Sequence, residues 1–419
     1  AVFIFMIMSV FVSLWDLYFL HERKFMDYSL FTENAKNRNL LHEIINNMPD
    51  IKINNAQKTE TQKWEENQNR INNLILKQMT INYKQNVGRN TMNRLRDIVI
   101  ICYCCIIAIE GNLTVGVLMS ISYILGQLGG PIGQIQSLLT QYQMFKVSMA
   151  RLSEVQRKEN EQQGAQEMQI DKFRHEILFS EVSFKYEGSF SPNIFEGLSI
   201  SFPANKMTAI VGNSGSGKTT LLKLIMGFYY PQKGKITIDE TPLNEIDINS
   251  WRNCCGVVLQ DGKIFSGTIT ENITLGSEII DEKKIETVSK LACIDEFIQK
   301  QPGKYNMKIG STGIELSQGQ KQRILIARAL YKDPQLLIFD EATSSLDTVN
   351  ERRIMDNLKY YFMGRTVIVV AHRLSTVVNA DNIIFLENGK IAEQGTHKTL
   401  VAKKGKYYEL IKNQLELEN

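Results

Sequence analysis

The sequence predicts a helical membrane-spanning part followed by an α/β domain with a largely parallel sheet. Long uncharged apolar stretches gather in the first third of the chain, whereas short β-type runs separated by turns begin at about residue 172. A glycine-rich segment, GNSGSGKT, lies between one such run and an apolar helical pattern. A chain of 419 residues is long enough for two or three domains.

Composition narrows the class of partner. The formal net charge is +3 and no long basic run occurs, which argues against nucleic acid as the main partner. The six cysteines show no Cys-x-x-Cys or Cys/His spacing, so the sequence offers no zinc site of the usual kind. We expect the cysteines to act as small apolar side chains, those beyond the membrane stretch in reducing surroundings.

Three stretches predict membrane-spanning helices: residues 1–15, 98–109, and 111–146, where the first charge is Lys146. Each is close to the ~20 apolar residues that a bilayer crossing requires. Buried helices of a soluble protein are the alternative, but three such stretches in one third of a chain favour a membrane. A signal peptide does not fit the start, because there is no initiating methionine, basic leader or small-residue cleavage site. Since the sequence begins inside an apolar element, we expect it to be a fragment of a longer polypeptide.

The charged residues 21–97 keep a helical apolar rhythm that Pro49 and Asp50 interrupt. This pattern predicts two long helices that meet at a short turn or helix near residues 46–56. Residues 21–97 are rich in Lys and Arg, so we expect them on the cytoplasmic side of the membrane. A short outer turn, residues 110–114, then leads into a further helix. We expect a partial transmembrane domain at 1–160, a linker at 161–171 and a second domain at 172–416. Polar side chains near or within the apolar stretches are candidates for interhelical hydrogen bonds or, less directly, substrate contacts: Asp16, Gln127 and Gln134.

The second part predicts strands at EILFSEVSF, MTAIV, GKITID, CCGVVL, QLLIF, TVIVV and IIFLENGKIAEQG. Helical patterns alternate with several of these runs, which is typical of a parallel sheet. Asn388-Gly389 between two apolar runs predicts a hairpin.

The strongest local signal is GNSGSGKT, residues 212–219, after the run MTAIV and before the helical pattern TTLLKLIMGF. In this context the glycines let successive N–H groups surround phosphate, Lys218 reaches the β and γ oxygens, and the Thr219 hydroxyl is offered to Mg²⁺. The alternative is a turn rich in glycine and serine without a ligand.

Two further runs end in residues suited to phosphate chemistry. Asp340 and Glu341 follow LLIF, so the first carboxylate could hold a metal and the second could orient or deprotonate water. His372 follows RTVIVVA and could hydrogen-bond a γ-phosphate. A solvated turn and a structural histidine are the alternatives for these positions.

The segment ELSQGQKQRILIARAL predicts a helix with Ser317 as N-cap and Gln320 as the second member of a capping box. Gly319 at the second helical position has no Cβ, so backbone can come close to a ligand. The free N–H groups and the helix dipole favour an anion there, although many helices with this start are only well capped.

The ordered set GNSGSGKT, Gln260 after VVL, LSQGQ, LLIFDE, SSLD and AHR resembles the nucleotide-binding domain of ATP-binding cassette (ABC) transporters over residues 172–416. The resemblance implies binding of ATP and Mg²⁺, with Tyr186 stacked on adenine, Gln260 as a sensor of Mg²⁺ and the membrane domain, Asp340 as an aid to the metal, Glu341 as general base and His372 as switch histidine. It also implies that LSQGQ closes over the ATP of a second, identical chain, with Asp347 connecting the two sites. The expected nucleotide-binding residues are Tyr186, Gly212, Asn213, Ser214, Gly215, Ser216, Gly217, Lys218, Thr219, Thr220, Ser317, Gly319, Gln320 and Asp347; the expected catalytic residues are Glu341, His372 and Gln260, and the metal ligands Thr219, Gln260 and Asp340.

Residues 1–160 resemble the last three membrane helices of an exporter of this family, with a coupling segment at 46–56. More narrowly, IKINNAQ, LSQGQKQRILIARAL and the C-terminal tail resemble Bacteroidetes peptide and bacteriocin exporters that carry an N-terminal peptidase domain. The resemblance implies a multi-pass protein of the bacterial inner membrane with a cytoplasmic nucleotide-binding domain, exporting a peptide. A fragment without the first helices is not expected to transport or cleave its substrate unaided.

Two positions depart from the family pattern. Gln318 stands where the family most often has glycine, and MKIGSTG, residues 307–313, replaces an acidic-glycine-acidic-arginine pattern. A polar side chain at the first helical residue can point away, so we expect little loss from Gln318. The second departure leaves open how the domain senses the membrane helices. A lipid or drug exporter and a regulatory ABC ATPase without transport are the alternative functions.

Overall fold

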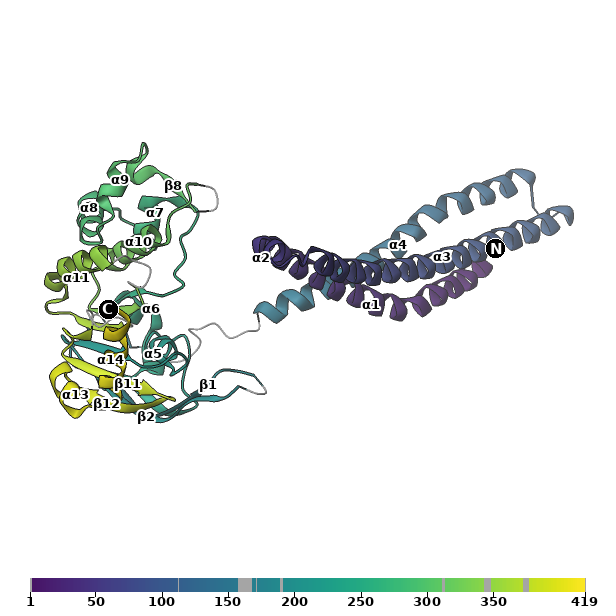
Figure 1. The fold of residues 1–419 in the computed structure, drawn as a ribbon. Coiled ribbons are helices and arrows are strands. Elements are labelled where there is room, and N and C mark those ends of the chain that lie inside the picture. Colours follow the sequence, from purple (N-terminus) through teal and green to yellow (C-terminus); the bar gives the residue numbers. More distant parts are fainter. Residues whose placement is uncertain are drawn as a thin grey trace. The chain divides into compact units, whose positions relative to one another are not determined.

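The computed structural model describes residues 2–111, 113–156, 168–170, 172–188, 191–310, 313–342, 348–371 and 377–418. The chain divides into two compact units, Ala1–Lys158 and Glu159–Asn419, and each is described by itself (Figure 1). The expected linker at 161–171 lies mostly outside the described residues.

The first unit consists of long helices, as the sequence predicts. They are α1 (Val2–Asn46), α2 (Met48–Ile53), α3 (Gln57–Ile109) and α4 (Val115–Gln156). The short helix α2 lies where the coupling segment is expected, and Pro49 is in its first turn, where a missing N–H costs nothing. The turn between α3 and α4 falls at the predicted outer turn.

Helices α1 and α3 lie antiparallel and are joined by carboxylate–amide contacts (Figure 1). The Gln85 amide donates to Asp16 at 2.8 Å, the Gln78 amide to Asp27 at 2.6 Å, and the Asn67 amide to Glu33 at 3.1 Å. The predicted interhelical role of Asp16 is therefore confirmed. Gln127 and Gln134 are exposed on α4, and the expectation for them stays a prediction.

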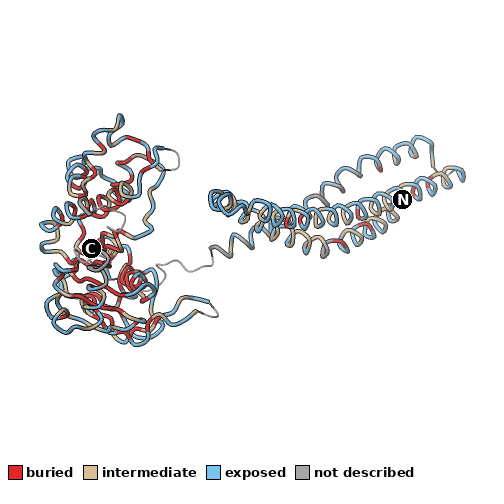
Figure 2. The backbone as a smooth tube through the Cα atoms, viewed as in Figure 1, coloured by how far each residue is buried: buried red, intermediate tan, exposed pale blue. Residues whose placement is uncertain are grey.

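Counting only residues whose side chains are described, no helix carries an apolar run long enough to cross a membrane. Figure 2 shows that buried residues are sparse in the first unit and concentrated in the second. The outer faces of the long helices nevertheless carry large exposed apolar side chains, among them Phe3, Phe11, Tyr18, Ile109 and Met119.

The second unit is built on a six-stranded sheet in the order β12-β11-β3-β10-β9-β6. Every pairing is parallel except β11 with β12, which confirms the predicted sheet type. Side chains alternate between two cores: Leu337 and Phe339 of β9 lie in one, Leu336 and Ile338 in the other. Both faces of the sheet are therefore covered, which explains the continuous apolar runs in these strands. The strands are β3 (Met207–Val211), β6 (Cys255–Val258), β9 (Leu336–Asp340), β10 (Thr366–Val370), β11 (Asn382–Glu387) and β12 (Lys390–Gly395).

A second, antiparallel sheet in the order β2-β1-β4-β5 covers one side of the unit. Its strands are β1 (Glu176–Lys185), β2 (Asn193–Pro203), β4 (Lys233–Ile238) and β5 (Thr241–Pro242), and a small pair joins β7 (Gly267–Thr268) to β8 (Lys308–Ile309). Helices α7, α8 and α9 gather beside α10, away from the β11–β12 hairpin (Figure 1). The helices are α5 (Lys218–Ile225), α6 (Ile248–Asn253), α7 (Ile269–Ile273), α8 (Glu282–Leu291), α9 (Asp295–Gln299), α10 (Gln318–Tyr331), α11 (Thr348–Phe362), α13 (His397–Lys403) and α14 (Lys406–Glu418).

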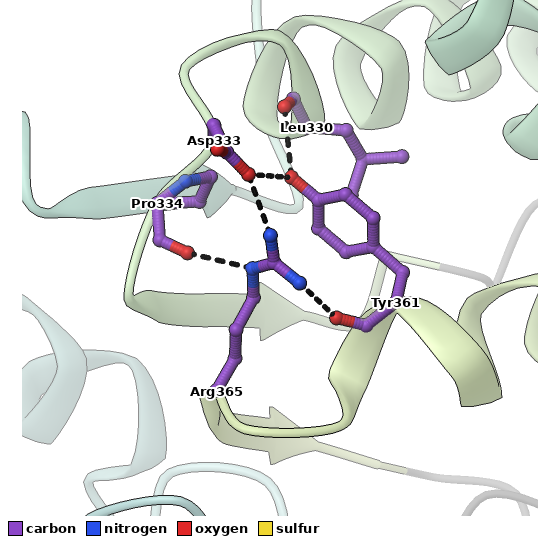
Figure 3. Close-up of polar contacts among 5 residues, drawn as sticks. All are labelled: Leu330, Asp333, Pro334, Tyr361 and Arg365. Atoms are coloured by element: carbon purple, nitrogen blue, oxygen red, sulfur yellow. Dashed lines mark hydrogen bonds and ion pairs between the residues drawn. The ribbon is translucent and has the colours of Figure 1, made fainter.

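Two turns are fixed by local chemistry. Asn388 and Gly389 have φ of 48° and 73°, the positive values that a two-residue hairpin turn requires, so the predicted β11–β12 hairpin is confirmed. The turn between α10 and β9 is held by Arg365, whose guanidinium donates to Asp333 at 2.6 Å, to the Tyr361 carbonyl at 2.6 Å and to the Pro334 carbonyl at 3.2 Å (Figure 3).

Candidate nucleotide-binding site

The glycine-rich loop runs from the end of β3 into the start of α5, as predicted. Gly212 has φ of 152° and a Cβ there would overlap the Leu386 carbonyl of the neighbouring strand β11. Gly217, the residue before α5, has φ of 102° and lies against the Phe195 ring. These two positions need glycine, because an L side chain would meet both strain and steric overlap. The loop is thereby folded tightly over the N-terminus of α5.

Lys218 is buried and folds back over the loop. Its ammonium group donates to the carbonyl oxygens of Gly212 and Asn213, at 2.9 Å each. Burial lowers the pKa of Lys218, and the carboxylates of Glu341 and Asp340 act in the opposite direction. Both acids at the end of β9 therefore lie near the phosphate loop at the end of β3. Only β10 separates these two strands, and the carboxyl ends of parallel strands meet at one edge of the sheet.

Two polar atoms of this site are buried with no hydrogen-bond partner among the described residues: Ser216 Oγ and Asp340 Oδ1. Burial raises the pKa of Asp340, and the charge of Glu341 adds to this, while a hydrogen bond from Thr219 and the charge of Lys218 lower it. Leaving a buried carboxylate oxygen unpaired costs free energy. Such a group suits a ligand that supplies positive charge.

Thr219 and Asp340 fit the protein share of a Mg²⁺ site. Within the described ranges no cluster of three His, Cys, Asp or Glu side chains could hold a metal. Mg²⁺ bound to a nucleotide needs only one or two protein oxygens, because phosphate and water supply the others. The Thr219 hydroxyl and the unpaired Asp340 oxygen are oxygens of this kind.

Glu341 follows β9 with φ of 51°, a left-handed conformation that is uncommon for a residue with a side chain. Its N–H donates to the Val370 carbonyl of β10 at 3.2 Å, and its carbonyl accepts from the Gln322 amide of α10 at 3.1 Å. The backbone of Glu341 is thus fixed from two elements. Strain of this kind is typical of functional sites.

Tyr186, predicted to stack on adenine, lies beside the start of α5. Its hydroxyl shares a hydrogen bond of 3.1 Å with the Thr220 hydroxyl. The rings of Phe184 and Tyr229 contact it edge-on, at centroid distances of 5.2 Å and 5.1 Å. The structure therefore brings two predicted nucleotide-binding residues, Tyr186 and Thr220, into contact.

The predicted capping box at α10 is confirmed. The Gln320 N–H donates to Ser317 Oγ at 3.3 Å, and the Ser317 N–H donates to Gln320 Oε1 at 2.9 Å. Ser317 is exposed and Gly319 is the second residue of the helix. The N-terminus of α10 therefore presents a polar, accessible end, as an anion site would require.

Gln260 follows β6 at the same edge of the sheet and is exposed. With Gln318, Lys321 and Lys263 it lines a hollow of about 520 Å³ between the segment after β6 and the start of α10. Gln318 is the first residue of α10 and is exposed, as predicted. The remaining predicted loop residues, Asn213, Ser214 and Gly215, lie in the glycine-rich loop itself, whereas His372 and Asp347 lie outside the described residues.

Both units of the chain match known protein families. Residues 195–344 match the family described as "ABC transporter", and residues 1–132 match the "ABC transporter transmembrane region". The chain combines an ABC transporter ATPase domain with residues of an ABC transporter transmembrane region. The second unit is its ATPase domain, and the helical first unit belongs to its transmembrane region. The predicted fold class is confirmed.

Relatives of the ABC transporter chain include proteins whose names describe toxin translocation. It is 35% identical over 381 residues to the alpha-hemolysin translocation ATP-binding protein HlyB of Escherichia coli, covering 90% of this chain and 53% of HlyB. It is 35% identical to the toxin RTX-I translocation ATP-binding protein of Actinobacillus pleuropneumoniae, covering 93% of this chain and 54% of the relative. The chain thus spans about half the length of the curated relatives it matches.

A solved structure supports the same architecture. The structure of a bacterial Atm1-family ABC exporter with ATP bound matches with a TM-score of 0.93 and 28% identity, covering 99% of this chain and 72% of that one.

Sequence reasoning missed one residue of the site, Gln322. It is 6% exposed and lies in the apolar stripe of α10 with Ile326 and Leu330. A lone amide in an otherwise apolar helical stripe was the available signal.

Proposed function

We propose that this chain is part of a half-transporter that couples ATP hydrolysis to export of a peptide or protein across the bacterial inner membrane. The observation that carries the proposal is the convergence of Lys218, Asp340 and Glu341 at one sheet edge, on a chain that also holds a transmembrane region. Exposed apolar side chains along α1, α3 and α4 suit contact with lipid. We further propose α2 as the coupling segment and Glu159–Asn419 as the cytoplasmic unit.

The proposed chemistry assigns one task to each group. The loop N–H groups and Lys218 bind the β- and γ-phosphates, and Tyr186 holds the base. Thr219 and Asp340 would hold Mg²⁺, which neutralises developing charge on the phosphate oxygens. Glu341 orients or deprotonates the water that attacks the γ-phosphorus, while the bond to the β–γ bridging oxygen breaks and ADP leaves. Gln260 and His372 are proposed to assist at the γ-phosphate.

The substrate class rests on the relatives. HlyB, the RTX-I protein and the leukotoxin translocation ATP-binding protein LktB of Mannheimia haemolytica are named for translocation of protein toxins. A polypeptide substrate, including a bacteriocin-like precursor, is therefore favoured over the lipid or drug that other exporters carry. A regulatory ATPase without transport is disfavoured because residues 1–132 match a transmembrane family.

Replacing Glu341 by Gln tests the proposal. In the full-length protein, Glu341→Gln should lower steady ATP hydrolysis at least ~100-fold, because general-base catalysis contributes on that order. ATP binding should persist, since Lys218 and the loop are unchanged. Hydrolysis is measured as phosphate release and binding with a fluorescent ATP analogue; Glu282→Gln, an exposed carboxylate on α8, serves as the matched control.

Inverted membrane vesicles that hold the full-length protein separate transport from hydrolysis. The wild type should take up a labelled polypeptide substrate when ATP is added, and the Glu341→Gln protein should not. Uptake of lipid or drug without polypeptide uptake would redirect the proposal to those substrates. Unchanged hydrolysis in Glu341→Gln would show that another group is the base.

A further inference from the structure

We propose that Gln322 is a positioning residue for Glu341, and that it ties the orientation of this general base to helix α10. The inference rests on the proposed function, since it deals with the same ATPase site. It concerns a contact within one chain, between the helix that presents Ser317 and the strand end that presents Glu341.

The contact joins two buried groups. The Gln322 side chain is 6% exposed, and its Nε2 donates to the Glu341 carbonyl at 3.1 Å. Around it, α10 buries Ile324, Ile326 and Leu330 completely. An amide in such surroundings costs free energy unless it is hydrogen-bonded, so the interaction with Glu341 is favoured over any arrangement that leaves the amide unpaired.

The acceptor is a residue whose backbone needs support. Glu341 has φ of 51°, and conformations of this kind persist only where neighbouring groups hold them. The Val370 carbonyl holds its N–H from β10, and Gln322 holds its carbonyl from α10. Without the hydrogen bond from Gln322, the Glu341 carbonyl loses its contact with α10, so the backbone that orients the side chain is held less tightly.

Helix α10 is a stable base for this contact because its far end is anchored to the same strand. The turn from α10 to β9 is held by the Arg365, Asp333 and Tyr361 contacts drawn in Figure 3. From this turn α10 runs back along the sheet, in contact with β6, the strand next to β9. Nine residues of helix span about 13 Å and five residues of strand about 16 Å, so Gln322 comes level with Glu341.

The hydrogen bond links phosphate contact at the N-terminus of α10 to the orientation of Glu341. Ser317, the N-cap of α10, and Gly319 lie five and three residues before Gln322, which is about one turn of the same helix. A shift of α10 that accompanies phosphate contact at its N-terminus therefore changes the backbone of Glu341 through the hydrogen bond from Gln322. Gln322 acts on hydrolysis through Glu341 and touches no phosphate itself.

Two substitutions remove the N–H donor and keep an apolar side chain of similar size: Gln322→Met and Gln322→Leu. Both should lower kcat about 10-fold, while the KM for ATP and the affinity for a fluorescent ATP analogue stay within about twofold of wild type. Gln299→Met, the same change at an exposed glutamine of α9, should leave both parameters unchanged.

A double-mutant cycle in the full-length protein decides whether Gln322 acts through Glu341. In the Glu341→Gln background, Gln322→Met should change the residual single-turnover rate by less than twofold, because no carboxylate remains to be misplaced. An equal loss in both backgrounds, a loss confined to KM, or full activity of Gln322→Met would overturn the inference. Absence of ATPase activity in the wild type would instead overturn the proposed function.

Discussion

Asp340 combines a functional position with an unfavourable environment. Its side chain is 2% exposed, and Oδ1 has no hydrogen-bond partner among the described residues. We expect Asp340→Asn to stabilise the ligand-free protein by about 1–2 kcal/mol, since the variant removes a desolvated charge. The unfolding transition of the second unit should rise by about 2–4 °C for each kcal/mol. Scanning calorimetry of the full chain measures this, with the exposed Asp356→Asn as control.

The raised pKa of Asp340 also predicts how the stabilising effect of Asp340→Asn depends on pH. Burial raises the pKa of Asp340, so the folded chain binds this proton more tightly than the unfolded chain. Its contribution to stability is then lost as pH rises from the ordinary value of 3.8 through the raised folded value. The gain from Asp340→Asn should accordingly be larger at pH 7 than at pH 3.5. A transition temperature at pH 7 that is lower for the variant than for the wild type would contradict the destabilising effect of burying Asp340. Added Mg-ATP, in contrast, should stabilise the wild type more than the variant, because the variant lacks the carboxylate proposed to hold Mg²⁺.

Single residues of the site were predictable where a motif sets their spacing. The loop from Gly212 to Thr219, the acids after β9 and the capping box of α10 follow from sequence order and local geometry. Gln322 and the left-handed backbone of Glu341 did not follow, because they depend on how α10 lies against β9. A tertiary hydrogen bond of this kind leaves only a weak trace in the sequence, here one amide in an apolar stripe.

At the scale of elements, the parallel strands were predictable because burial on both faces makes them continuous apolar runs. The helix–turn–helix excursion and α2 were predictable from the helical rhythm and its interruption at Pro49. The antiparallel sheet was less predictable, and its strand β2 is not among the strands predicted from the sequence. Strand β2 holds Gly197 at φ of 65° and its register with β1 shifts, so its alternation of buried and exposed side chains is irregular. Such irregular edges weaken the period-two signal on which strand prediction depends.

The contact of Trp15 with Gly88 sets how closely α1 and α3 pack. A Cβ at Gly88 would overlap the Trp15 ring, whose indole N–H donates to the Gln85 carbonyl at 3.2 Å. We expect Gly88→Ala to destabilise the helix pair by about 1–3 kcal/mol, in spite of the better helix propensity of alanine. The loss of helical circular dichroism on heating the detergent-solubilised full-length protein measures this.

Two further variants distinguish steric overlap with the Trp15 ring from the effect of alanine's helix propensity. Gly126→Ala on α4 meets nothing within 4 Å, so it should be neutral or stabilising. Combining Gly88→Ala with Trp15→Ala should cost less than the sum of the single changes, because the truncated ring leaves room for the methyl group. Strict additivity would show that the Trp15 ring does not limit the approach of the helices.

At the scale of the whole molecule, one chain carries the loop, Lys218, Asp340 and Glu341, which we assign to phosphate binding and water activation. The N-terminus of its α10 is exposed, so this helix end can contact a nucleotide bound to another chain. We propose that two identical chains bind two ATP molecules, each between the loop of one chain and Ser317 of the other. Lys218→Ala disables a loop and Ser317→Arg disables an α10 end. In a heterodimer of these two variants, a shared site leaves one loop and one α10 end intact together, whereas a site within one chain leaves none.

Nucleotide trapping distinguishes the two arrangements without requiring turnover. With Glu341→Gln added to both chains of the full-length protein, each type of homodimer should trap no ATP, because Lys218→Ala removes phosphate binding and Ser317→Arg blocks the α10 end. The purified heterodimer, isolated through two different affinity tags, should trap one ATP per dimer. Dimers that carry only Glu341→Gln should trap two, which calibrates the assay. Zero trapped ATP in the heterodimer, alongside two in that control, would place Ser317 and the loop of one chain at the same nucleotide.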